Sequence, residues 1–90
     1  MESLVIYNGH RIVVDHHIDS MKLVVDDVTY AEISGLRNTN KDNVLVALIP
    51  NENGATDEIK VEYTDAKLLQ LTGKLVFYYN GKLIAEKKTM

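Results

Sequence analysis

The residues with the clearest capacity for chemistry lie in one short stretch, Asp15-His16-His17-Ile18-Asp19, directly after an apolar run. Side chains of an extended chain alternate between two faces, so Asp15, His17 and Asp19 share one face of a strand that continues through this stretch. Neighbours on one face lie about 6–7 Å apart, and their side chains can lean together to share a cation. Because an imidazole with carboxylates suits zinc or manganese, these three residues are the predicted metal ligands.

The same residues also have a purely structural interpretation, as a solvated face at the end of a strand. His16 falls on the opposite face together with Ile12 and Val14. A lone histidine on an apolar face usually stays neutral and bonds to a backbone carbonyl, so His16 is expected to point inward.

The sequence Asp15-His16-His17 resembles the Asp-His-His signature of the DHH-type phosphoesterases, in which an apolar strand delivers these residues to a manganese-dependent site. The resemblance implies phosphoester hydrolysis. A metal-dependent hydrolase or metal-binding protein centred on Asp15, His16, His17 and Asp19 is therefore the alternative function. That family also requires separated aspartate motifs and a further substrate domain. A chain of 90 residues has room for one domain, so we do not assign it to the family.

The sequence offers little else for catalysis. It contains no cysteine, which excludes disulfides and thiolate ligands. Neither a Gly-x-Ser-x-Gly elbow nor a Gly-rich phosphate loop is present. The adjacent carboxylates Asp26 and Asp27 fall at an expected turn, where aspartate is favoured for its hydrogen bonds to the backbone. We therefore predict no catalytic residue and no cofactor, and we expect a protein that is not an enzyme.

The run Phe77-Tyr78-Tyr79 lies near Lys74 and Lys82, which suggests a stacking platform for single-stranded nucleic acid. Alternation puts Phe77 and Tyr78 on opposite faces, so the rings do not form one platform. The net charge of −3 gives no general attraction to a phosphate backbone. Binding of single-stranded nucleic acid is kept only as a second alternative.

The strongest structural signals are two Asn-Gly pairs, at 8–9 and 80–81, each between strand-like runs. Asn-Gly accepts the positive φ that both central positions of a type I′ turn require, so each end of the chain is predicted to form a hairpin. A two-residue loop also fixes the register. The predicted partners are Tyr7–His10, Val5–Ile12 and Leu4–Val13 in the first hairpin, and Tyr79–Lys82, Phe77–Ile84 and Val76–Ala85 in the second.

Four further segments lie between these hairpins. Residues 22–25 and 28–33 flank Asp26-Asp27 and predict a third hairpin, with a short helix from Thr29 as the alternative. Residues 43–49 are apolar after the first, which is typical of a central strand. Residues 58–63 alternate, so Ile59, Val61 and Tyr63 are expected to face inward. For residues 65–72 a short helix is favoured over a strand.

Together these segments predict one mainly β domain over residues 1–90, a small antiparallel β-sandwich or barrel of about seven or eight short strands with at most one or two short helices. The chain shows no signal peptide and no long apolar span, so we expect a cytoplasmic protein without membrane contact. With no catalytic constellation and with apolar residues on both faces of its strands, the leading function is a non-enzymatic protein-binding or assembly module. We expect self-association as a homo-oligomer, or a protein partner.

Overall fold

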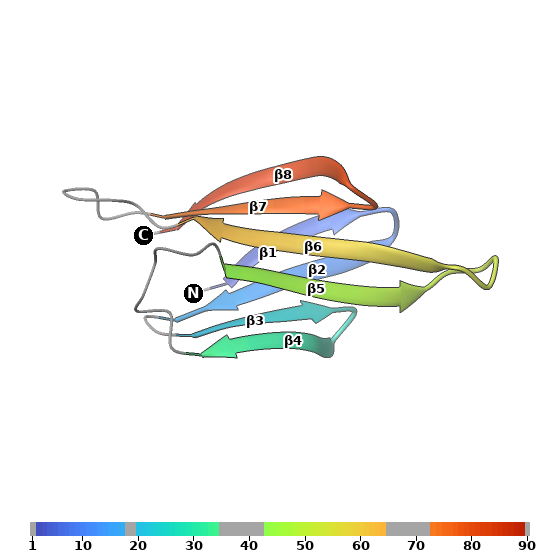
Figure 1. Cartoon of the computed structure of the whole chain (residues 1–90), viewed down its shortest axis with the longest axis horizontal. Helices are drawn as coiled ribbons and strands as arrows, with labels where there is room; N and C mark the ends of the chain where they lie inside the picture. Colours follow the sequence, from blue (N-terminus) through green and yellow to red (C-terminus); the bar gives the residue numbers. More distant parts are fainter. Residues whose placement is uncertain (1, 18–19, 35–42, 65–72, 90) are drawn as a thin grey trace.

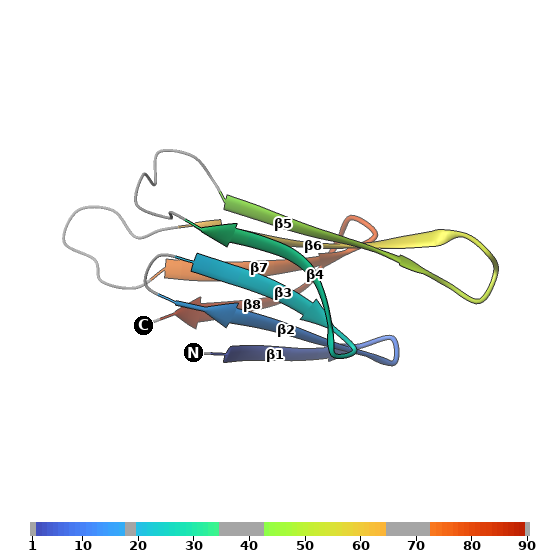
Figure 2. The same cartoon turned by 90° about the horizontal axis from the view of Figure 1, so that it is seen from below.

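The computed structural model describes residues 2–17, 20–34, 43–64 and 73–89, which form eight β-strands and no helix. Strands β1–β4 make one antiparallel sheet and β5–β8 a second, each in sequence order. The two sheets lie one over the other (Figures 1 and 2) and share one apolar core. The predicted small β fold is thus confirmed as two stacked sheets. The strands are β1 (Glu2–Tyr7), β2 (His10–His16), β3 (Ser20–Val25), β4 (Val28–Ser34), β5 (Asn43–Pro50), β6 (Thr56–Thr64), β7 (Gly73–Tyr79) and β8 (Lys82–Thr89).

The core follows from the two-residue period of the strands, because every second side chain points between the sheets. Phe77 is the largest fully buried side chain. The inward orientation predicted for Ile59, Val61 and Tyr63 is confirmed, since their exposed fractions are 0%, 0% and 8%. The other buried core residues are Val5, Ile12, Val14, Met21, Leu23 and Val25 from the first sheet, and Leu45, Ala47, Ile49, Leu75 and Tyr79 from the second. No helix among the described residues is long and apolar enough to cross a bilayer.

Both Asn-Gly hairpins are confirmed. The φ angles are 53° and 78° at Asn8 and Gly9, and 49° and 82° at Asn80 and Gly81, as a type I′ turn requires. In the first hairpin all three predicted pairs form, which are Tyr7–His10, Val5–Ile12 and Leu4–Val13.

The register predicted for the second hairpin is correct only beside its turn. Tyr79 pairs with Lys82, but an irregularity between Phe77 and Tyr78 shifts the remaining pairs by one residue. Phe77 therefore pairs with Ala85 instead of Ile84, and Val76 pairs with Glu86 instead of Ala85. The extra residue allows Ile84 and Ala85 both to pack against the core, which successive residues of a regular strand cannot do.

The third hairpin is also confirmed, with Asp26 and Asp27 at φ angles of 51° and 68°. Residues 28–34 are strand β4, so the alternative helix from Thr29 is wrong. The cause is tertiary packing, because strand pairing with β3 places Ala31 and Ile33 against the core. The helix predicted for residues 65–72 lies outside the described residues.

Among the described strands, β6 is the only neighbour of β5 in its sheet, so β5 is an edge strand and not the predicted central one. Its inward residues Leu45, Ala47 and Ile49 are buried as expected. Its outward residues lie on an uncovered face, where Val44, Val46 and Leu48 are 39%, 39% and 60% exposed. The apolar residues on both faces of this run predicted that both faces are buried, but in this fold only the inward face is.

Candidate functional site

The turns that join consecutive strands surround an open hollow of about 840 Å³ at one end of the sandwich. The Asn8-Gly9 turn, the connection between β5 and β6, and the start of the β7–β8 turn form its walls. Four asparagines, one histidine, one tyrosine and two carboxylate side chains line it, and no lysine or arginine does so within the described chain. We refer to this feature as the hairpin-end hollow.

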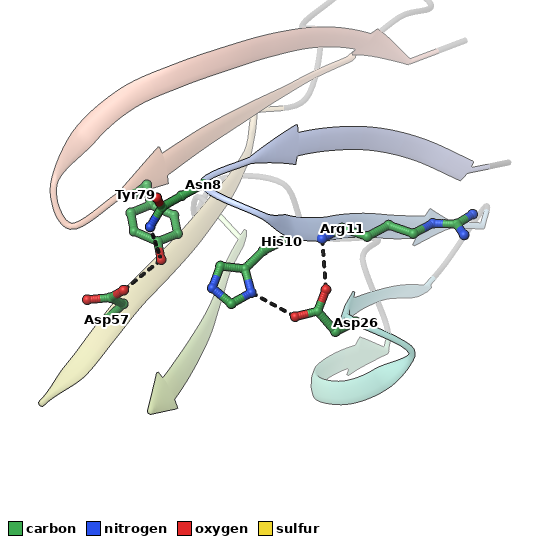
Figure 3. Close-up of polar contacts among 6 residues, drawn as sticks. All are labelled: Asn8, His10, Arg11, Asp26, Asp57 and Tyr79. Carbon is green, nitrogen blue, oxygen red and sulfur yellow. Dashed lines mark hydrogen bonds and ion pairs between the residues drawn. The ribbon is translucent and has the colours of Figure 1, made fainter. Parts of the chain in front are cut away.

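Asp57, near the start of β6, is the centre of the polar network in this hollow. Its Oδ2 accepts a hydrogen bond of 2.7 Å from the Tyr79 hydroxyl (Figure 3). Its Oδ1 accepts hydrogen bonds of 3.0 Å from Asn51 Nδ2 and 3.2 Å from Asn80 Nδ2. These donors stabilise the ionised form, so the pKa of the Asp57 carboxyl lies below its usual value, with the Tyr79 bond as the largest cause. Burial, followed by the bond to Asp57, raises the pKa of the Tyr79 phenol.

Backbone donors fix the orientation of the two amides that reach Asp57. Asn80 Oδ1 accepts the backbone N–H of Glu58 at 2.8 Å. Asn51 Oδ1 accepts the N–H groups of Asn53 at 2.9 Å and Ala55 at 3.1 Å. Because a backbone N–H can bond only to the oxygen of an amide, both NH₂ groups must face the carboxylate. Asp57 thus ties the β5–β6 connection to the β7–β8 turn.

A histidine–carboxylate pair borders the same hollow. Asp26 in the β3–β4 turn accepts a hydrogen bond of 2.7 Å at Oδ2 from His10 Nδ1 and one of 2.9 Å at Oδ1 from the Arg11 backbone N–H. The second ring nitrogen of His10 points away from Asp26 (Figure 3). The pKa of the Asp26 carboxyl is lowered, first by the Arg11 backbone bond and then by His10. With Nδ1 donating, Nε2 of the neutral imidazole is an acceptor.

The two lowered carboxyl pKa values predict how stability responds to acid. Asp26 and Asp57 bind protons less readily in the folded chain than in the unfolded one, where the pKa is near 3.8. The stability they contribute is therefore fully present above that pH and is lost as the pH falls through their lower folded values. We expect the urea midpoint to fall below about pH 4, and to fall less in the Asp26→Asn/Asp57→Asn double variant.

Urea unfolding followed by circular dichroism between pH 7 and pH 2 measures this dependence. Asp27→Asn is the matched control, because Asp27 is the neighbouring residue of the same turn. It should keep the acid dependence of the parent chain. An unchanged dependence in the double variant would contradict the prediction.

The structure places two of the three predicted metal ligands in contact. Asp15 Oδ1 lies 3.2 Å from His17 Nε2, and Asp19 is outside the described residues. His16 lies on the core face, with its ring centroid 4.9 Å from that of Tyr63, as expected for an inward histidine. Within the described ranges no group of three or more metal-ligating side chains is found. The Asp15, His17 and Asp19 site stays a prediction, at the opposite end of β2 from His10.

The aromatic run of β7 is divided between two faces, as predicted. Phe77 is fully buried in the core. Tyr78 lies on the outer face, where Lys60 Nζ is 5.0 Å from its ring centroid. Phe77 and Tyr78 therefore do not form a common stacking surface.

The sequence interpretation did not identify the hairpin-end hollow, although its signals were present. Asn8, Asn80 and Asp26 were each recognised as turn residues. In an antiparallel meander, alternate connections return to the same end of the sheet. Combining this rule with the turn positions would have brought the polar turn residues of each sheet together. The approach of Asp57 to Tyr79 depends in addition on how β6 and β7 pair.

No protein-family model, no curated protein and no solved structure matches the chain.

Proposed function

We propose that this protein is a non-enzymatic assembly module that self-associates through the edge strand β5, in the cytoplasm as the sequence suggests. The observation that carries the proposal is the row of Val44, Val46 and Leu48, which are 39%, 39% and 60% exposed on a strand that pairs on one side only among the strands that the structure describes. An exposed edge with apolar side chains is a template for pairing with another strand.

The two edges of the second sheet differ in how they are protected. Strand β8 carries Lys82, Glu86, Lys87 and Lys88, and such charges discourage edge-to-edge pairing. Strand β5 has no charged residue from Asn43 to Pro50. Proline has no backbone N–H to donate to a neighbouring strand, but Pro50 is the last residue of β5, so the rest of the edge can still pair. The contrast favours β5 as the associating edge.

The sequence of β5 is compatible with pairing to a second copy of itself. In an antiparallel pair centred on Val46, that residue faces its own equivalent and Val44 faces Leu48, so the exposed row becomes a continuous apolar ladder. Such a two-fold contact is isologous and closes as a dimer. On β6, the partners of Leu48, Val46 and Val44 are Glu58, Lys60 and Glu62, which would border the apolar ladder with charges of both signs.

The proposal predicts a dimer that Val46→Lys disrupts. At the two-fold axis this substitution places like charges opposite one another, and we expect the dissociation constant to rise by about tenfold or more. Light scattering over a concentration series measures the change. Leu83→Lys is the matched control, because Leu83 is an aliphatic residue 50% exposed on the other edge of the same sheet. A parent chain that stays monomeric at high concentration, or equal disruption by Leu83→Lys, would overturn the proposal.

A further inference from the structure

We infer that Asn53, in the connection between β5 and β6, is a site of spontaneous covalent modification, at which the asparagine amide is lost and aspartate or isoaspartate forms. The inference is independent of association through β5. It depends on how differently the fold holds the three Asn-Gly pairs of the sequence, at 8–9, 53–54 and 80–81.

The reaction is a ring closure between an asparagine side chain and the next peptide group. The backbone nitrogen of Gly54 forms a bond to Cγ of Asn53 as the bond from Cγ to Nδ2 breaks, and the Gly54 amide proton leaves with the NH₂ group as ammonia. Water then opens the succinimide, adding its hydroxyl to one of the two ring carbonyls and its proton to the ring nitrogen. Opening at Cγ gives aspartate, and opening at the main-chain carbonyl gives isoaspartate.

A following glycine favours this reaction, because it has no Cβ atom to obstruct the attack. All three Asn-Gly pairs share that advantage, so the sequence alone does not distinguish them. The fold decides which pair reacts, through the bonds that hold each asparagine amide and the peptide group after it.

The pairs in the two hairpin turns are restrained. Ring closure requires the amide to turn toward its own following peptide group, so the bonds that hold the amide must first break. Asn80 Oδ1 accepts the Glu58 N–H at 2.8 Å, and Asn80 Nδ2 donates to Asp57 at 3.2 Å. Asn8 Nδ2 donates to the hydroxyl of Tyr79, a core residue, at 3.2 Å. The residues that flank each turn also pair with one another, which holds the peptide group between Asn and Gly.

Asn53 has neither restraint. Its side chain is exposed and forms no hydrogen bond with any residue that the structure describes. Asn53 and Gly54 belong to residues 51–55, which lie between β5 and β6 instead of in a two-residue turn. The Gly54 N–H donates to the Asn51 carbonyl at 3.2 Å, a longer bond than the 2.9 Å bond from the Asn51 N–H to the Ala55 carbonyl. Ring closure at Asn53 therefore requires the loss of one long backbone bond and no side-chain bond.

The products alter the connection in two ways. Oδ1 of Asn51 accepts the N–H groups of Asn53 and Ala55, which lie on either side of the reacting link. Isoaspartate adds one carbon to the chain between these two donors, so their spacing changes. Either product also adds a negative charge beside Glu52 and Asp57, which line the same hollow as Asn53. That charge separates the modified chain from its parent by anion exchange.

The test follows the three pairs while the folded full chain is incubated in mildly alkaline buffer, which favours loss of the Gly amide proton. Peptide mapping by mass spectrometry identifies each product, because replacement of NH₂ by OH raises the peptide mass. We expect products at Asn53 to form about tenfold or more faster than at Asn8 or Asn80, since local opening must first break the bonds of those two amides. Asn53→Gln is the matched variant, because its longer side chain must close a larger ring, and it should remove the fast product.

The same incubation in guanidinium chloride separates the effect of the fold from that of the sequence. In the unfolded chain each asparagine precedes glycine and none is held, so the three rates should become similar. The inference is overturned if Asn8 or Asn80 reacts as fast as Asn53 in the folded chain, if Asn53 keeps its lead in denaturant, or if Asn53→Gln retains the fast product. None of these outcomes decides whether β5 associates, so the two proposals fail independently.

Discussion

Replacing Phe77 with alanine is expected to lower the free energy of unfolding by about 3–5 kcal/mol. Phe77 is fully buried and lies on β7, where Val61 and Ala85 are its cross-strand partners. The substitution removes a large apolar surface from the core and leaves a cavity between neighbours that pairing holds in place. A domain of this size has only about 5–15 kcal/mol in total, so the substitution should remove a large share of its stability.

Urea unfolding monitored by circular dichroism measures this loss for Phe77→Ala. Tyr78→Ala is the control, because it removes the next aromatic ring of the same strand from the outer face. Tyr78 is only half-buried and contacts Lys60, so the control should cost about 1 kcal/mol. If Tyr78→Ala costs as much as Phe77→Ala, the apolar core does not lie where the structure places it.

Replacing Gly73 with alanine is expected to cost about 1–3 kcal/mol, although the change adds a single methyl group. A Cβ atom on Gly73 would lie 2.6 Å from both Cε1 and Oη of Tyr63. The Tyr63 ring is buried, and the His16 ring lies 4.9 Å from it between centroids, so Tyr63 has little room to withdraw. A glycine inside a strand is typical of such a close approach.

A double-mutant cycle identifies the cause of this loss. Gly73→Ala should cost less in a Tyr63→Leu background, because the ring atoms nearest to the added methyl group are then absent. Residues in contact usually show coupling free energies of about 0.5–3 kcal/mol. Equal costs of Gly73→Ala in the two backgrounds would show that the loss does not come from the contact with Tyr63.

Sequence reasoning identified the local structure well wherever turn chemistry determines it. Asn8-Gly9, Asn80-Gly81 and Asp26-Asp27 each require positive φ at two successive positions, and that demand is visible in the residue types. The register next to each Asn-Gly turn followed from loop length alone. It failed beyond Tyr78, because the irregularity there allows Ile84 and Ala85 both to contact the core, and packing between sheets is not visible in a single strand.

Sequence reasoning missed the edge position of β5 and the hairpin-end hollow for a related reason. Apolar residues on both faces of residues 43–49 indicate that both faces could be buried. They do not show whether the strand has a hydrogen-bonded neighbour on each side. The turn residues of the hollow were found individually, but the distance between Asp57 and Tyr79 is set by strand pairing. Asp15, His16 and His17 are adjacent in the sequence, so a sequence pattern can identify them. The residues of the hollow come from separate turns and meet only in the folded chain.

The order of strands within each sheet has a consequence for how the chain finds its structure. Every hydrogen-bonded neighbour is also the neighbour in sequence, so each sheet can grow by short loop closures, each with a small entropic cost. Parts of the chain that are distant in sequence come together when the two sheets, β1–β4 and β5–β8, pack against one another. We therefore expect the slow step of folding to be the packing of the two sheets, with the loss of water between them, and not the formation of the strand pairs within each sheet.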